Sequence, residues 1–123
     1  MTIRAIVVDD NNGIRNTFSD LLKMHKINVV GSGNNGLEAV KKFQELKPDV
    51  IFLDIMMPKY DGIYAMQEIR KIDPNANIVI ISGAGPNEME VIKKMKPSAI
   101  IHKPFDINSI LHVLKEELCL ETE

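Results

Sequence analysis

The sequence of 123 residues has one cysteine, Cys119, and no tryptophan. A single cysteine cannot form an internal disulfide, which favours a reducing compartment. No apolar run approaches the ~20 residues that a membrane-spanning helix needs. The chain enters a strand pattern directly after its first residues, so we expect neither a signal peptide nor membrane insertion. Together these absences predict a cytoplasmic location.

Positive and negative residues nearly balance, because the chain has 15 Lys and Arg and 17 Asp and Glu, giving a net charge of −2. Like-charged runs are no longer than pairs such as Lys41-Lys42, so no basic arm argues for direct nucleic-acid binding. Hydrophobic residues make up 45% of the chain, which is enough for a core and too much for a disordered segment. We expect a single domain over residues 1–123.

Apolar runs rich in β-branched residues alternate with segments of helical periodicity along the whole chain. We expect strands at residues 3–8, 28–30, 49–54, 77–82 and 98–102, and helices at 11–26, 36–46, 62–72, 86–95 and 106–118. Continuous apolar strands between amphipathic helices are typical of a parallel sheet covered on both faces. The sequence therefore predicts an α/β fold of three layers, with the polar second strand at an edge.

Acidic residues, a serine and a lysine stand at or directly after the ends of the expected strands. Parallel strands place their carboxyl ends on one edge of the sheet, where open α/β sheets bind ligands. The residues at that edge are three carboxylates, a hydroxyl and an ammonium, supplied by Asp9, Asp10, Asp54, Ser82 and Lys103. Carboxylates this close to a buried sheet are costly unless a cation or hydrogen bonds compensate them.

A divalent cation would supply that compensation. Mg²⁺ takes oxygen ligands from one or two carboxylates and commonly bridges to a phosphate. Lys103 and Ser82 suit the oxygens of a phosphoryl group. An aspartate beside the metal and the lysine can attack phosphorus and form an aspartyl phosphate, because both cations neutralise the developing charge.

Four motifs that contain these residues resemble the receiver domain of two-component response regulators. They are Asp9-Asp10, Asp54 with Met57-Pro58 and Asp61-Gly62 behind it, Ser82-Gly83-Ala84, and Lys103-Pro104-Phe105. Each motif is weak alone, but the four in this order and spacing are specific, and the resemblance covers residues 3–118. It implies a flavodoxin-like, CheY-like (βα)5 three-layer sandwich with a five-stranded parallel sheet of order 2-1-3-4-5.

The resemblance also implies roles for the acidic residues. Asp54 would be the phosphoacceptor and would lie beside Mg²⁺. Asp10 would hold the metal directly and Asp9 mostly through water. The backbone carbonyl of Met56 would be a further ligand of the metal.

Ser82 and Lys103 would contact the phosphoryl oxygens, and the bond from Lys103 to Pro104 would be cis. Phosphorylation adds about −1.5 to −2 charges, which would draw Ser82 towards the new oxygens and move the loop at residues 83–85. A partner would then read the face formed by the helix at 86–95, the strand at 98–102 and the helix at 106–118.

The function that the resemblance implies is a phosphorylatable receiver in a two-component phosphorelay. It would accept a phosphoryl group on Asp54 from a sensor histidine kinase or a phosphotransfer protein, with Mg²⁺, and would signal by protein–protein contact, as in chemotaxis. It would catalyse only its own phosphorylation and dephosphorylation. The chain could also be part of a longer regulator.

Three positions bear on how such a receiver would switch and lose its phosphoryl group. Many members carry an aromatic residue three positions before the lysine, where this chain has Ile100, so an aromatic switch is not expected. Met56 and Ala84 stand two residues beyond the phosphoacceptor and the hydroxyl residue. Neither side chain can orient an attacking water, so we expect slow autodephosphorylation.

Two alternative interpretations remain. Gly31, Gly33 and Gly36 form a G-x-G-x-x-G pattern after a strand, and Asp54 follows Gly36 by 18 residues, as in a dinucleotide-binding domain. That interpretation gives the aspartates after the first strand and the Lys103-Pro104 pair no role. The other alternative is a receiver-like module that binds a partner without being phosphorylated.

Overall fold

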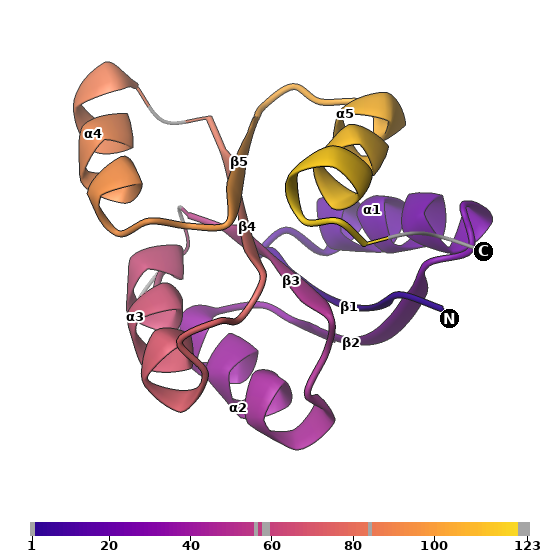
Figure 1. Ribbon diagram of the computed structural model, residues 1–123, viewed down its shortest axis with the longest axis horizontal. Helices are drawn as coiled ribbons and strands as arrows, with labels where there is room; N and C mark the ends of the chain where they lie inside the picture. The colour runs from indigo at the N-terminus through magenta and orange to yellow at the C-terminus, as the bar shows by residue number, and fades with distance from the viewer. Residues whose placement is uncertain (1, 56, 58–59, 84, 121–123) are drawn as a thin grey trace.

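The computed structural model describes residues 2–55, 57, 60–83 and 85–120. Strands and helices alternate along the chain in five β/α units (Figure 1). Their bounds are β1 Arg4–Val8, α1 Asn12–Met24, β2 Asn28–Gly33, α2 Gly36–Leu46, β3 Val50–Asp54, α3 Gly62–Ile72, β4 Ile78–Ser82, α4 Pro86–Lys94, β5 Ala99–His102 and α5 Ile107–His112. Within the described ranges, no helix is long and apolar enough to cross a membrane.

The five strands form one parallel sheet in the order β2-β1-β3-β4-β5, which confirms the predicted fold and strand order. Every residue of β3 and β4 is buried, as the apolar runs that make up all but their last residues require in a sheet covered on both faces. The polar residues at their ends, Asp54 and Ser82, are buried as well. β2 lies at the edge as expected but continues to Gly33, three residues beyond the predicted end. The glycine-rich segment is a strand because Gly31 to Gly33 pair with Ile6 to Val8.

Helices cover both faces of the sheet. α1 and α5 lie on one face, and α2, α3 and α4 lie on the other (Figure 1). Under α1 and α5, the ring of Phe18 contacts Phe52 at a centroid distance of 5.1 Å and Phe105 at 5.3 Å. Under the other three helices, side chains such as Phe43, Met66 and Ile92 fill a second core. The predicted three-layer architecture is therefore confirmed.

The last helix differs from the expectation of one continuous helix to residue 118. After His112 the chain makes a π-helical turn over Val113–Glu117, in which Leu118 N–H donates to the Val113 carbonyl at 3.0 Å. The neighbouring side chains of Val113 and Leu114 are both buried in the core. The wider π-helical turn lets both side chains point towards the sheet. The 3.6-residue period of an α-helix does not predict that two successive residues will be buried in this way.

Side chains cap the starts of four helices. Asn11, Asn35, Asp61 and Asp106 each accept a hydrogen bond from the backbone N–H three residues further on, at the starts of α1, α2, α3 and α5. The N–H and the hydroxyl of Ser109 hold the pKa of Asp106 below its usual value of 3.8. α4 is the exception, because its N-cap is Gly85 and makes no side-chain cap.

The other end of α4 is held firmly. The guanidinium of Arg70 on α3 donates to the carbonyls of Ala76 at 2.7 Å and Lys96 at 3.1 Å. The Ser98 hydroxyl accepts from Ile78 N–H at 2.9 Å and donates to the Ala76 carbonyl at 3.2 Å. α4 is therefore tied to the base of the sheet, and its start at the carboxyl edge lacks a cap.

Replacing Gly85 with serine is expected to raise the free energy of unfolding by about 0.5–1 kcal/mol. Gly85 has φ −77° and ψ 176°, which any residue adopts, and a Cβ there would meet no atom within 4 Å. Serine can cap α4 without adding charge near the carboxylates. Urea denaturation measures the gain, with Gly85→Ala as the control that lacks a capping oxygen. Equal stability of the two variants would show that the cap does not form.

Candidate functional site

The carboxyl edge of the sheet brings together those predicted site residues that the structure describes. Asp54 is the last residue of β3 and pairs in register with Ile81 of β4, while Ser82 ends β4 and pairs with His102 of β5. β1 and β5 are each followed by site residues, and β1 lies directly beside β3. The strand order therefore decides which side chains meet.

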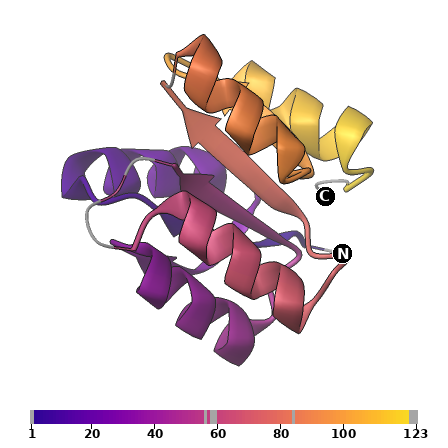
Figure 2. The same cartoon turned by 90° about the vertical axis from the view of Figure 1, so that its left-hand side faces the viewer.

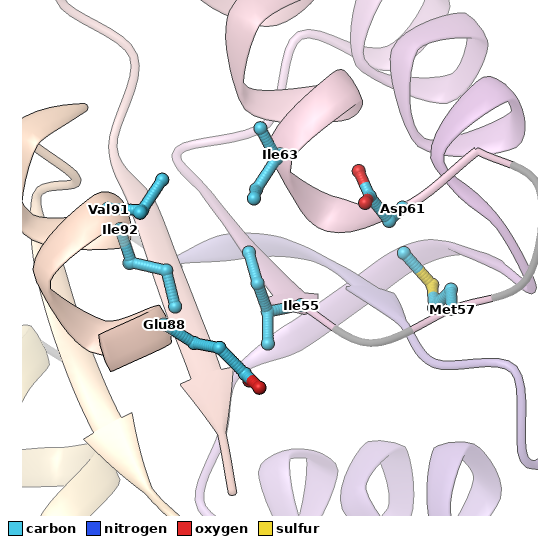
Figure 3. Close-up of a pocket in the computed structure, with 7 residues that line it drawn as sticks. All are labelled: Ile55, Met57, Asp61, Ile63, Glu88, Val91 and Ile92. Carbon is cyan, nitrogen blue, oxygen red and sulfur yellow. The ribbon is translucent and has the colours of Figure 1, made fainter. Parts of the chain in front are cut away.

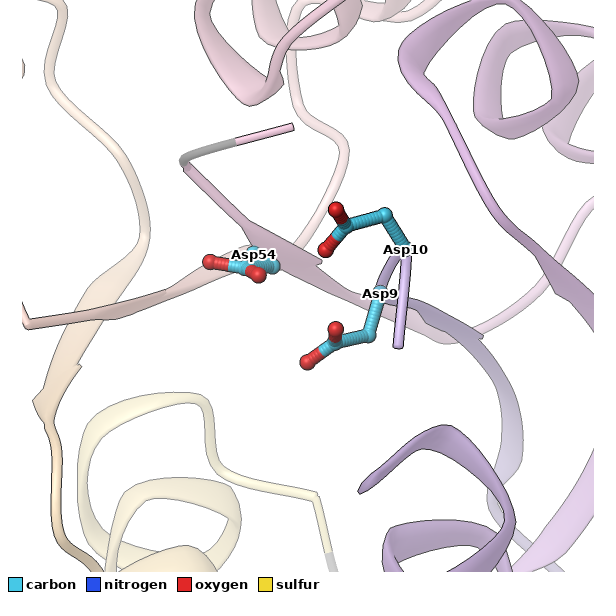
Figure 4. Close-up of side chains that lie close together, drawn as sticks. All are labelled: Asp9, Asp10 and Asp54. Atoms are coloured by element: carbon cyan, nitrogen blue, oxygen red, sulfur yellow. The ribbon is translucent and has the colours of Figure 1, made fainter. Parts of the chain in front are cut away.

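Three carboxylates meet beyond the ends of β1 and β3 (Figure 4). One oxygen from each of Asp9, Asp10 and Asp54 lies within 4.8 Å of the other two. Asp9 and Asp54 are each 6% exposed, and Asp10 is exposed. Two oxygens on one Mg²⁺ can be at most about 4.2 Å apart, because each bond is 2.0–2.1 Å. Oxygens within 4.8 Å of one another are thus close enough for one such ion to reach them, directly or through water.

Lys103 brings a positive charge to the same cluster. Its Nζ lies 3.4 Å from Oδ1 of Asp54 and 3.9 Å from Oδ2 of Asp9. One ammonium cannot balance three carboxylates, two of which are buried. The donor set therefore favours a hard divalent cation at this edge.

Asp9 is positioned by residues that the sequence pattern did not single out. Its Oδ1 accepts the N–H of Asn11 at 2.9 Å, and its backbone carbonyl accepts from Arg15 at 2.8 Å. These bonds leave Oδ2 on the side of Lys103. Asn11 also caps the start of α1.

Ser82 and Lys103 are tied to each other through the backbone. The Ser82 side chain is fully buried, and its carbonyl accepts the N–H of Lys103 at 2.8 Å. The bond from Lys103 to Pro104 is cis, as expected. β5 therefore presents the lysine at a fixed place beside the end of β4.

Gly62 allows α3 to begin against the end of β3. Its N–H donates to the Ile55 carbonyl at 3.2 Å. A Cβ at this position would lie 2.7 Å from the Asp54 carbonyl oxygen and 2.9 Å from Cα of Ile55. The Asp61-Gly62 pair was part of the predicted motif, but its role in packing emerges only from the structure.

The structure tests only one of the three positions that were expected to affect switching and hydrolysis. Met56, the expected carbonyl ligand, and Ala84, the expected neighbour of an attacking water, lie outside the described residues. Ile100 on β5 is half-buried and packs against the core beneath α2, α3 and α4. An isoleucine thus occupies the place of the aromatic residue that many members of the family carry.

The last glycine of the G-x-G-x-x-G pattern, Gly36, packs against the segment that precedes α3. The N–H of Gly36, at the start of α2, donates to the Tyr60 carbonyl at 2.5 Å. A Cβ at Gly36 would lie 2.5 Å from the Asp61 carbonyl oxygen. The helix start that a dinucleotide phosphate would need is therefore covered by the segment before α3, and β2 is an edge strand.

Residues 5–115 match the family model described as response regulator receiver domain. The match covers most of the 123 residues. The chain belongs to the response regulator receiver family.

Two curated relatives differ in how much of their length this chain matches. The chain is 41% identical over 115 residues to chemotaxis protein CheY of Thermotoga maritima, covering 92% of this chain and 95% of that protein. It is 38% identical over 124 residues to protein-glutamate methylesterase/protein-glutamine glutaminase 2 of Methanosarcina mazei, covering 97% of this chain and 34% of the relative. The matching region is thus most of one relative and about a third of the other.

Solved structures agree with the fold. A chain in the CheX-CheY-BeF3-Mg²⁺ complex of Borrelia burgdorferi superposes with a TM-score of 0.87 at 25% identity, covering 97% of this chain and 90% of that one. The response regulator domain of Thermotoga maritima CheB gives a TM-score of 0.84 at 30% identity, covering 98% and 99%. The family and the fold therefore agree.

Proposed function

We propose that this receiver accepts a phosphoryl group on Asp54 in the presence of Mg²⁺. The observation that carries the proposal is the meeting of three carboxylates within 4.8 Å, with Nζ of Lys103 at 3.4 Å from Asp54. Burial of Asp54 excludes bulk water from one side of its carboxylate. Positive charge beside the nucleophile would favour attack on phosphorus, because it offsets the charge that develops on the transferring group.

The chain's own residues would carry the transfer as follows. An oxygen of Asp54 forms the new bond to phosphorus, the bond from phosphorus to the donor's histidine nitrogen breaks, and that nitrogen keeps the electron pair. Lys103 and Ser82 would hold the phosphoryl oxygens. Asp9 and Asp10 would hold Mg²⁺, which neutralises charge on the transferring group when bound.

The partners in this proposal are a sensor histidine kinase or phosphotransfer protein and a downstream protein. Ser82 directly precedes the loop that starts α4, whose N-cap makes no side-chain bond. A pull on Ser82 would therefore reach the face of α4, β5 and α5. Similarity to chemotaxis protein CheY supports a chemotaxis-type role. In this proposal the domain acts in the cytoplasm and catalyses only its own phosphorylation and dephosphorylation.

The test of this function is incubation with acetyl phosphate and Mg²⁺, followed by measurement of intact mass. We expect a gain of one phosphoryl group that EDTA prevents, because the carboxylates need the cation. No gain over a wide range of acetyl phosphate concentrations would instead support a receiver-like module that binds its partner without phosphorylation.

Replacing Met56 with asparagine is expected to accelerate loss of phosphate on the order of tenfold, because an amide can orient the attacking water and a thioether cannot. The readout is the decay of the phosphorylated mass after acetyl phosphate is removed. Met24→Asn, at a site 77% exposed on α1, is the matched control and should decay like the wild type. Unchanged decay of Met56→Asn would show that water orientation at this position does not limit hydrolysis.

A further inference from the structure

α3 and α4 leave between them a groove that the phosphoryl site does not use. At the carboxyl edge it is a pocket of about 520 Å³, lined by Ile55, Met57, Asp61, Ile63, Glu88, Val91 and Ile92 (Figure 3). A second pocket of about 540 Å³ lies further along the same helix faces, because its lining follows that of the first at helical spacing. It is lined by Met66, Gln67, Arg70, Lys71 and Met95. Figure 2 shows α3 and α4 running in a similar direction, with part of the sheet visible between them.

The groove is apolar along its floor and on part of its rim. Near the carboxyl edge the bottom of the groove is formed by buried residues, namely Ile55, Met57 and Ile92. Val91 on α4 is 51% exposed, and Ile63 on α3 is half-buried on the opposite wall. Such side chains favour a partner that brings apolar groups into the space between the helices.

Charge changes sign from one end of the groove to the other. Asp61 and Glu88 lie at the end near the carboxyl edge, one on each side (Figure 3). Arg70 and Lys71 lie at the end near the base, where Arg70 donates to backbone carbonyls and Lys71 pairs with Glu68 at 2.7 Å. An occupant of matching charge would therefore be basic at one end and acidic at the other.

The length of the groove suits a short helix. α3 has 11 residues and α4 has 9, so the walls extend for about 14–16 Å at 1.5 Å per residue. This corresponds to about three turns, which place apolar side chains at i, i+3 or i+4, and i+7 on one face. A helix is intrinsically favoured with acids in its first turn and bases in its last.

We propose that this groove binds an amphipathic helix of a partner protein, antiparallel to α3 and α4. The acidic first turn of that helix lies over Arg70 and Lys71, and its basic last turn lies over Asp61 and Glu88. Its apolar face inserts against Ile63 and Val91. This surface uses the side of α4 that faces α3, so it is separate from the proposed output face with β5 and α5.

The test uses two stapled helical peptides of about 14 residues with the same apolar face. One has glutamates in the first turn and lysines in the last, and the other has these charges exchanged. Fluorescence anisotropy with the full chain is expected to show about tenfold tighter binding of the first peptide. Val91→Glu should weaken that binding about tenfold, since it places a charge on the apolar wall. Met24→Glu on α1 should leave it unchanged.

A second variant keeps the test decisive if Val91→Glu disturbs folding. Glu88→Lys, at an exposed position, should shift the preference towards the peptide with exchanged charges. Equal affinity for both peptides, or binding that neither variant changes, would overturn the proposal. Sedimentation of the chain alone that shows dimers, lost in Val91→Glu, would also overturn it by assigning the groove to a second copy.

Discussion

Asp54→Asn is expected to abolish uptake of a phosphoryl group from acetyl phosphate in Mg²⁺. The amide has nearly the shape of the carboxylate but lacks its charge and its nucleophilic oxygen. Removal of a covalent nucleophile lowers rates by several orders of magnitude, on the order of 10⁴ or more in well-studied enzymes. Intact mass after incubation measures the effect directly.

The control for this variant is a carboxylate outside the cluster. Asp20→Asn changes an exposed residue of α1 and should be phosphorylated like the wild type. Urea denaturation of both variants checks that the fold is retained. A phosphoryl group that Asp54→Asn still acquires would move the acceptor to Asp9 or Asp10, the two other carboxylates within reach of the same cation.

Gly62→Ala is expected to have the second largest effect, on both stability and phosphorylation. The new Cβ would lie 2.7 Å from the Asp54 carbonyl oxygen and 2.9 Å from Cα of Ile55, so either α3 or the end of β3 must shift. Overpacking of this kind costs about 1–3 kcal/mol of the free energy of unfolding. A displacement of about 1 Å at Asp54 would lower the phosphorylation rate by about 100-fold.

Two measurements separate these effects, namely urea denaturation and the rate of mass gain in acetyl phosphate. Gly83→Ala is the matched control, because its Cβ would meet only Cβ of Lys103 at the ordinary contact distance of 3.9 Å. No described glycine has a positive φ, so neither substitution introduces backbone strain of that origin. Equal stability of Gly62→Ala and the wild type would show that α3 can retreat from β3 without cost.

Much of the architecture could be predicted because it is encoded locally. The helices at Gly36–Leu46 and Gly62–Ile72 have the predicted bounds, since their apolar periodicity and flanking residues decide where they begin and end. The acids, the serine and the lysine were placed on one edge by parallel-strand geometry alone. The strand order itself was implied by the resemblance to receivers and is confirmed by the sheet.

Contacts between distant segments could not be predicted in this way. Nothing in the periodicity of the chain indicates that Gly36 packs under Tyr60 or that Gly62 packs against Asp54. The continuation of β2 to Gly33 was missed because glycine and serine favour turns, and pairing with β1 overrides that preference. The groove between α3 and α4 was missed for a similar reason, because it depends on how far apart the sheet holds two helices.

By itself the sequence determined which residues are available for chemistry and on which edge they lie. That follows from strand and helix periods, which each segment carries in its own side chains. Only the tertiary structure decided that three carboxylates approach within 4.8 Å and that Lys103 comes within 3.4 Å of Asp54. Those distances depend on the sheet order and on glycines that let segments far apart in the chain touch, which no local pattern can specify.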